Sequence, residues 1–222
     1  KAEFGPLADA IAGAQAAARL RAEHLIHLRC EVSTENVLAH YEEFEGDPLV
    51  RLVSLMDHAP GQRQFQTLEQ YIVYYKKKRG LTDDEFDAFC KRQQDLSARY
   101  AKPHRDGIAA SCAARNVSVA SHDDATLDHV EEAIGYGIRL AEFPTSFEAA
   151  KASHVAGMSV LMGAPNIVRG KSHSGNIAAR DLAEMGVLDV LSSDYVPFSL
   201  MHAPFILADE GMSPPKAIAM GT

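Results

Sequence analysis

The chain has 222 residues, and its 22 Lys and Arg residues against 30 Asp and Glu residues give a formal net charge of −8. This balance argues against a nucleic-acid-binding or polybasic membrane-surface protein, because both need a basic surface to meet phosphate. A hydrophobic content of 46% with 23% charged residues is typical of a soluble globular domain with a substantial core.

Two further features bear on the compartment. No apolar stretch approaches the ~20 residues that cross a bilayer, and the first residues have no signal-peptide pattern. The three cysteines, Cys30, Cys90 and Cys112, are widely spaced without a CxxC pair, which predicts neither a disulfide framework nor a zinc-thiolate site. We therefore expect a cytoplasmic protein with no membrane partner.

The first part of the chain predicts helices alternating with short apolar strands. An alanine-rich helix is expected from Pro6 to Glu23, and a strand over Leu25–Cys30. A second helix is expected after Ser33 and Thr34, which are good N-cap residues. The apolar run Leu49–Met56 predicts a second buried strand.

The same alternation returns after residue 115. Helices are expected from Thr126 and Ser146, and strands over Val117–Ala120, Ile138–Ala141, Met158–Met162 and Val187–Leu191. The last three strands each follow a glycine placed as a helix C-cap, namely Gly137, Gly157 and Gly186. About six short apolar strands separated by helices indicate a parallel α/β sheet. Polar residues end nearly every strand, which favours a partial or complete (β/α) barrel over an open sheet.

One segment interrupts this rhythm, so we interpret residues 1–222 as a single barrel domain with a helical insertion at about 66–115. The insertion carries Tyr71, Tyr74 and Tyr75, a basic run from Lys76 to Arg79, and a capping box from Thr82 to Glu85 that predicts a helix start. The basic run could bind a phosphate or a partner, but a solvated helix end is the favoured interpretation.

Carboxylates and imidazoles follow the predicted strands in succession. In a parallel barrel they would all face one mouth, and they are Glu31, Asp57, His58, His122, Asp123, Asp124, Glu142, Asn166 and Asp194. Crowding such groups costs repulsion and desolvation, which a cation relieves. Imidazole nitrogen with carboxylate oxygen is the ligand set of divalent zinc, iron or manganese.

Two other segments are candidate anion sites. The stretch Gly163–Asn176 is rich in glycine, hydroxyl, amide and cationic groups and is expected to lead into a helix near Asn176, which would make it a phosphate cradle or a plain capped surface loop. The turn Asp57–Gln64 offers Arg63, whose guanidinium could fork onto phosphate or simply lie at the surface.

Several motifs together resemble the phosphonate-metabolism branch of the amidohydrolase superfamily. They occur in the order HLRCE (27–31), MDHAPGQRQ (56–64), SHDDAT (121–126), EFPTS (142–146), GAPNIVRGKSHSGN (163–176) and LSSDYVP (191–197). The resemblance runs from about Leu25 to Pro215, and these long motifs are specific to the branch. It implies a metal-dependent TIM-like barrel that hydrolyses the triphosphate of a ribosyl phosphonate, a small-molecule substrate, and releases pyrophosphate.

The resemblance also assigns roles to residues. It implies that Glu31 replaces a bridging carboxylated lysine, that His58 and His122 bind metal, and that Asp194 is both ligand and general base. One or two ions are expected, with zinc favoured over iron or manganese. The implied phosphate-binding residues are Arg63, Arg169, Lys171, Ser172, His173, Ser174 and Asn176, and the additional site candidates are Asp57, Asp123 and Glu142. Lys171 stands where a glycine is usual and adds a cation.

The amidohydrolase HxH pair of the first strand does not occur in this sequence. We therefore expect a barrel lacking its first strands and its C-terminal β-sandwich segment, whose exposed strand edges would favour a homodimer. Three alternatives stay open: hydrolysis of a carbon–nitrogen bond by the same machinery, an inactive barrel fragment, and a metal-free phosphosugar barrel in which Glu31, His58, His122 and Asp194 are far apart or pair among themselves.

Overall fold

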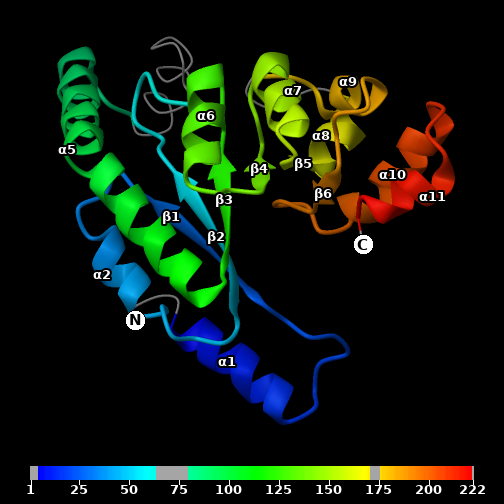
Figure 1. Cartoon of the computed structure of the whole chain (residues 1–222), viewed down its shortest axis with the longest axis horizontal. Helices are drawn as coiled ribbons and strands as arrows, with labels where there is room; N and C mark the ends of the chain where they lie inside the picture. The colour runs from blue at the N-terminus through cyan, green and yellow to red at the C-terminus, as the bar shows by residue number, and fades with distance from the viewer. Residues whose placement is uncertain (1–4, 64–79, 171–175, 222) are drawn as a thin grey trace.

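A six-stranded parallel sheet organises the molecule. The computed structural model describes residues 5–63, 80–170 and 176–221, and its strands lie in the order in which they occur in the chain (Figure 1). They are β1 (Ile26–Glu31), β2 (Val50–Met56), β3 (Ser118–His122), β4 (Leu140–Glu142), β5 (Ser159–Gly163) and β6 (Val190–Ser192). The predicted parallel α/β sheet of about six strands is confirmed.

The strand register aligns the carboxyl ends of the strands. Glu31 pairs with Met56, His122 with Glu142, and Gly163 with Ser192. Residues that end or directly follow the strands therefore lie along one edge of the sheet, which is where parallel α/β proteins place their sites.

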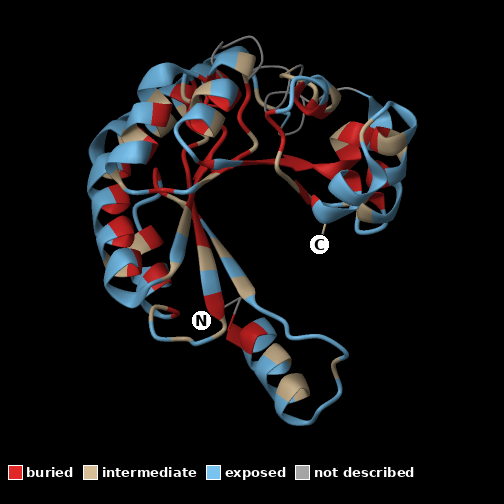
Figure 2. Cartoon of the chain, turned by 45° about the vertical axis from the view of Figure 1, so that its right-hand side comes forward, coloured by how far each residue is buried: buried red, intermediate tan, exposed pale blue. Residues whose placement is uncertain are grey.

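Helices cover the sheet in an arc along one side of the curved strands (Figure 2). This half-barrel arrangement is consistent with a TIM-like barrel. The helices are α1 (Gly5–Ala16), α2 (Val37–Glu42), α5 (Asp83–Arg115), α6 (Leu127–Gly135), α7 (Phe147–Val155), α8 (Ala164–Arg169), α9 (Ala179–Glu184), α10 (Ser199–Asp209) and α11 (Pro214–Ala219). Among the helices described, none is both long enough and apolar enough to cross a membrane.

Local capping signals explain where several helices begin and end. The predicted capping box is present at α5, where Thr82 and Glu85 bond each other's backbone N–H groups. Thr126 and Ser146 cap α6 and α7 through their side chains, as predicted. The three predicted glycines after helices all have positive φ, between +70° and +79°, a conformation that costs glycine little.

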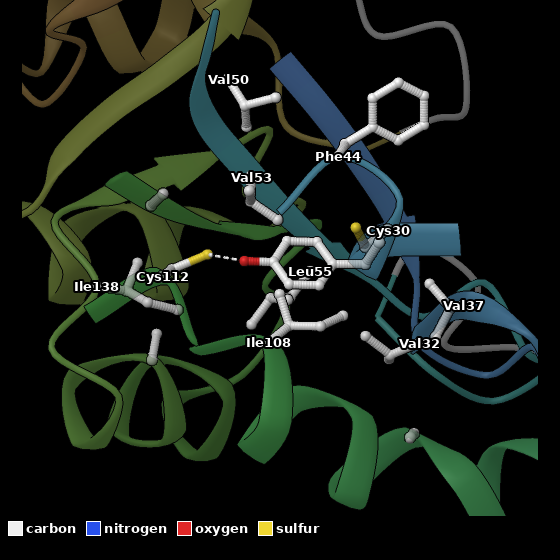
Figure 3. Close-up of a cluster of buried hydrophobic side chains, with 14 of the residues drawn as sticks. Cys30, Val32, Val37, Phe44, Val50, Val53, Leu55, Ile108, Cys112 and Ile138 are labelled. Atoms are coloured by element: carbon white, nitrogen blue, oxygen red, sulfur yellow. Dashed lines mark hydrogen bonds between the residues drawn. The ribbon is translucent and has the colours of Figure 1, made fainter. Parts of the chain in front are cut away.

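Two large apolar clusters, one on each half of the sheet, form most of the core, and a small third cluster lies around Phe86 and Cys90 of α5. In the first, Val53 and Leu55 of β2 pack with Ile108 of α5 (Figure 3). The hydroxyl of Tyr41 lies 3.4 Å from the sulfur of Cys112 inside this cluster. All three cysteines are free and buried, and their spacing in the sequence had predicted no disulfide framework.

Several predicted boundaries are corrected by the structure. The first helix ends at Ala16 instead of Glu23, and Ala18 follows in a left-handed conformation. Ser33 and Thr34 do not cap α2, because both side chains bond Glu31 and form a turn that precedes Asn36.

Within the predicted loop 163–176, residues 164–169 form α8, and the next helix begins at Ala179 instead of near Asn176. The described part of the predicted insertion is one helix, α5, of 33 residues. Residues 66–79, with the tyrosines and the basic run, lie outside the described residues.

Candidate metal centre

Two histidines and an aspartate meet at the carboxyl edge of the sheet. His58 follows β2, His122 ends β3, and Asp123 is the next residue. One ligand atom from each of the three lies within 4.8 Å of the others. Asp123 has a φ of +56°, a left-handed turn that ends β3.

His58 is held by a carboxylate from the neighbouring strand. Its Nδ1 lies 2.5 Å from Glu31 Oε2, and its backbone N–H donates to Glu31 Oε1 at 2.9 Å. Burial alone would lower the pKa of His58, but its interactions with Asp123 and Glu31 outweigh burial and raise the pKa to about 9. The imidazole is therefore a cation at neutral pH while no metal competes with its proton.

His122 is likewise held by a carboxylate from a neighbouring strand, that of Glu142 at the end of β4. Its Nδ1 lies 2.6 Å from Glu142 Oε2, which also accepts a hydrogen bond from Ser54 Oγ at 2.7 Å. Burial tends to raise the pKa of Glu142, but the hydrogen bonds that it accepts from His122 and Ser54 outweigh burial and lower the pKa to about 2. Ser54 in turn contacts His27 Nε2 at 2.5 Å.

The remaining ring nitrogens converge on one oxygen. The Nε2 atoms of His58 and His122 each lie 3.4 Å from Asp123 Oδ2. That oxygen is buried and makes no hydrogen bond of normal geometry. A buried, unbonded carboxylate oxygen facing two imidazole nitrogens fits a divalent cation, whose ligands have this chemistry. Carboxylates on the opposite ring nitrogens are the usual support of metal-binding histidines.

A cation and a second carboxylate flank this group. Arg29 Nη2 lies 3.1 Å from His122 Nε2, and because a guanidinium only donates, Nε2 is the acceptor and Nδ1 carries the proton given to Glu142. Asp194 follows β6 with a φ of +46°. Its side chain lies over Gly163, since a Cβ on that glycine would be 3.6 Å from Asp194 Oδ2. Partial burial raises the pKa of Asp194, against the opposing charge of Arg29.

Other predicted site residues lie in different surroundings. Asp57 and Asp124 are buried and paired with arginines. Arg63, a candidate phosphate ligand, is buried between Asp124 and Glu132. Asn166 Oδ1 accepts the backbone N–H of Ala179 at 3.1 Å and so helps to begin α9.

The predicted phosphate-binding loop is described only at its ends. Arg169 is exposed at the end of α8, with its guanidinium 5.7 Å from the ring centroid of Tyr195. Asn176 begins the next described segment. Lys171, Ser172, His173 and Ser174 lie outside the described residues.

Two residues of this centre were missed from the sequence. Arg29 lies two positions from both His27 and Glu31 on β1, and side chains of a strand alternate in direction, so the HLRCE motif already indicated that all three share a face. Ser54 gave no such signal, because a serine inside an apolar strand is common in cores.

Comparison with known proteins gives one strong likeness. The chain is 55% identical over 190 residues to the alpha-D-ribose 1-methylphosphonate 5-triphosphate diphosphatase of Escherichia coli (strain K12). The match covers 86% of this chain and 50% of that protein, so the chain spans about half the length of the curated relative it matches. No family model and no solved structure matches the chain. The likeness to phosphonate-metabolism proteins indicated by the motifs is thus confirmed.

Proposed function

We propose that this chain supplies the metal-binding edge of an amidohydrolase-type barrel that hydrolyses alpha-D-ribose 1-methylphosphonate 5-triphosphate and releases pyrophosphate. The observation that carries the proposal is the convergence of His58 and His122 on the unbonded oxygen of Asp123. The 55% identity to a diphosphatase favours phosphate chemistry over hydrolysis of a carbon–nitrogen bond.

His58, His122 and Asp123 would hold the metal, with zinc favoured because it accepts imidazole and carboxylate ligands together. Glu31, whose carboxylate contacts His58 Nδ1, is a further candidate ligand. A bound divalent ion supplies Lewis acidity, which acidifies water and offsets charge on phosphate oxygens. Glu31 and Glu142 fix the two rings so that their Nε2 atoms face the ligand position.

Asp194 would accept the proton of the attacking water. Its carboxyl lies at the end of β6 on the same edge of the sheet, and its raised pKa brings it closer to the range in which a base accepts a proton efficiently.

Arg169 would bind a substrate phosphate, because its exposed guanidinium stands beside Tyr195, the neighbour of Asp194. Arg169 is better placed to bind phosphate than Arg63, because Arg63 would first have to break its ion pairs with Asp124 and Glu132. Ser172, His173, Ser174, Lys171 and Asn176 complete the proposed phosphate loop.

The metal-free phosphosugar barrel also accounts for the pairing of Glu31 with His58. It leaves the buried Oδ2 of Asp123 without a hydrogen bond of normal geometry, whereas a metal ion would bind that oxygen. A homodimer remains a prediction, which light scattering would check by the molecular mass in solution.

The test is metal content and pyrophosphate release from a ribosyl triphosphate. Both are measured on this chain alone and within a protein of the relative's length. We expect His122→Ala to abolish metal binding and turnover, Asp194→Asn to abolish turnover, and the control His24→Ala, at an exposed histidine, to change neither. Absence of metal from every form would overturn the proposal.

A further inference from the structure

A buried ionic network lies directly beside the metal centre. Arg63 pairs with Asp124 and, through its other terminal nitrogen, with Glu132 at 2.5 Å. Arg105 pairs with Glu132 at 3.1 Å and with Asp57 at 3.3 Å. Glu132 thus joins the two arginines, and all the other side chains of the network are at most 10% exposed.

The network joins segments that are far apart in the sequence. Asp57 and Arg63 flank the turn after β2, Asp124 follows β3, and Arg105 and Glu132 lie on α5 and α6. Ser97 of α5 adds a hydrogen bond to Asp57 at 2.7 Å. The long helix α5 is therefore bonded to the loops that carry the candidate ligands.

Two members of the network are sequence neighbours of those ligands. Asp57 precedes His58, and Asp124 follows Asp123. A carboxylate fixed by an arginine restrains the backbone of its neighbour, so the network acts on both sides of the centre. The ligands themselves make no bond to either arginine among the contacts of the described residues.

Energetics favour a positioning role over a stabilising one. Buried ion pairs contribute little net stability, because desolvation offsets the attraction between the charges. The Nε atoms of Arg63 and Arg105 are also buried without hydrogen-bond partners, which adds cost. Arg63 has a φ of +33°, a conformation unfavourable for a side chain with a Cβ. Such strain persists where the surrounding structure enforces it, most often beside functional sites.

We propose that Arg63 and Arg105 are positioning residues, which clamp Asp57, Asp124 and Glu132 and so hold His58 and Asp123 in place for metal binding. The clamp itself is a feature of the fold, whereas its effect on metal affinity rests on the proposed function. It also gives Arg63 a role that does not include substrate phosphate.

The experiment compares Arg63→Met, Arg105→Met, Arg105→Lys and Glu132→Gln with the control Arg115→Met. Arg115 lies on the same helix α5 but pairs with Glu45 at the far end. Glu132→Gln removes the shared charge without removing bulk, so it keeps the test open where an arginine variant fails to fold. The first measurement is amide hydrogen exchange of residues 57–63 and 122–126 in the metal-free protein, and the second is zinc affinity by competition with a chelator.

We expect faster exchange in both segments and about a 10-fold or greater loss of zinc affinity in Arg63→Met, Arg105→Met and Glu132→Gln, by analogy with other outer partners of metal sites. Arg105→Lys should recover part of both losses, and Arg115→Met should leave both unchanged. Unchanged exchange in the folded variants would overturn the clamp. So would an Arg63→Met variant that only raises KM for the triphosphate, since that indicates phosphate binding.

The two proposals fail separately. If the wild-type protein binds no divalent metal ion, the proposed function is wrong, while hydrogen exchange still decides whether the clamp orders the two loops.

Discussion

His58 and His122 meet edge to face, with ring centroids 5.5 Å apart and an interplanar angle of 82°. The Nδ1 of each ring contacts the carboxylate of a glutamate from a neighbouring strand, and the Nε2 of each ring faces Asp123. The two contacts follow from the strand register, which sets these residues side by side at the sheet edge. The orientation of both candidate ligands is therefore fixed by the fold itself.

Replacing Glu142 by glutamine should weaken metal binding by about 10- to 100-fold, which is the usual loss when a carboxylate supporting a ligating histidine is removed. The glutamine can still accept from His122 Nδ1, but it lacks the negative charge that makes the ring a better ligand. Isothermal titration with zinc measures the change. The control is Glu148→Gln, at an exposed position on α7, and equal zinc affinity of both variants would contradict the assigned role.

The metal-free protein should lose stability as pH rises through the range from about 6.5 to about 9. The folded pKa of His58, raised to about 9, lies above its unfolded value of 6.5, so the charged pair with Glu31 stabilises the fold fully below pH 6.5. The loss is on the order of 3 kcal/mol, at 1.36 kcal/mol per pKa unit. Urea unfolding across this range measures it, and Glu31→Gln should flatten the slope.

Zinc affinity should change in the opposite direction over the same range. His58 must give up its proton to bind metal, so affinity rises with pH until the ring is neutral. Zinc affinity that stays constant between pH 6.5 and 9 would show that His58 is not a ligand.

Local signals explain why much of the fold could be predicted from the sequence. The capping box at Thr82, the caps at Thr126 and Ser146, and the glycines after helices are short-range patterns with one favoured structure. The first helix was predicted too long because alanine has high helix propensity, whereas most of residues 17–25 is exposed, so that burial of an apolar face does not stabilise a helix there.

Only the site residues at the carboxyl ends of the strands could be predicted from the sequence. Parallel strands bring His58, His122 and Asp123 to one edge whatever the details of packing. The partners of Arg63 were not predictable, because Arg63 lies in the turn after β2 and Glu132 lies 69 residues away on α6. An arginine in a polar turn looks the same in sequence whether it faces solvent or a buried carboxylate.

Ile108 should be the most sensitive position of the first core cluster. Its side chain is fully buried where α5 meets the sheet (Figure 3). Ile108→Ala should lower the free energy of unfolding by about 2–5 kcal/mol, through lost burial and the cavity left behind. Chemical denaturation measures this loss. Val155→Ala is the control, because Val155 is 77% exposed and its truncation should cost less than about 0.5 kcal/mol.

The pKa of His129, a half-buried histidine on α6, should report on the charge of the network. Its Nδ1 accepts the backbone N–H of Ala125 at 3.1 Å. Burial, followed by the charges of Arg63 and Arg105, lowers the pKa of His129 to about 4. Because the folded pKa lies below the unfolded value of 6.5, the neutral ring adds stability above pH 6.5, and this contribution is lost as pH falls towards 4.

NMR titration of the His129 ring tests this arrangement. In the wild-type protein the ring should stay neutral at pH 5.5, whereas in Arg63→Met or Arg105→Met its pKa should rise towards 6.5, because one nearby positive charge is removed. Arg115→Met again serves as the matched control, since its charge is not among those that shift His129. A wild-type ring that titrates near pH 6.5 would show that His129 is neither desolvated nor close to the two arginines.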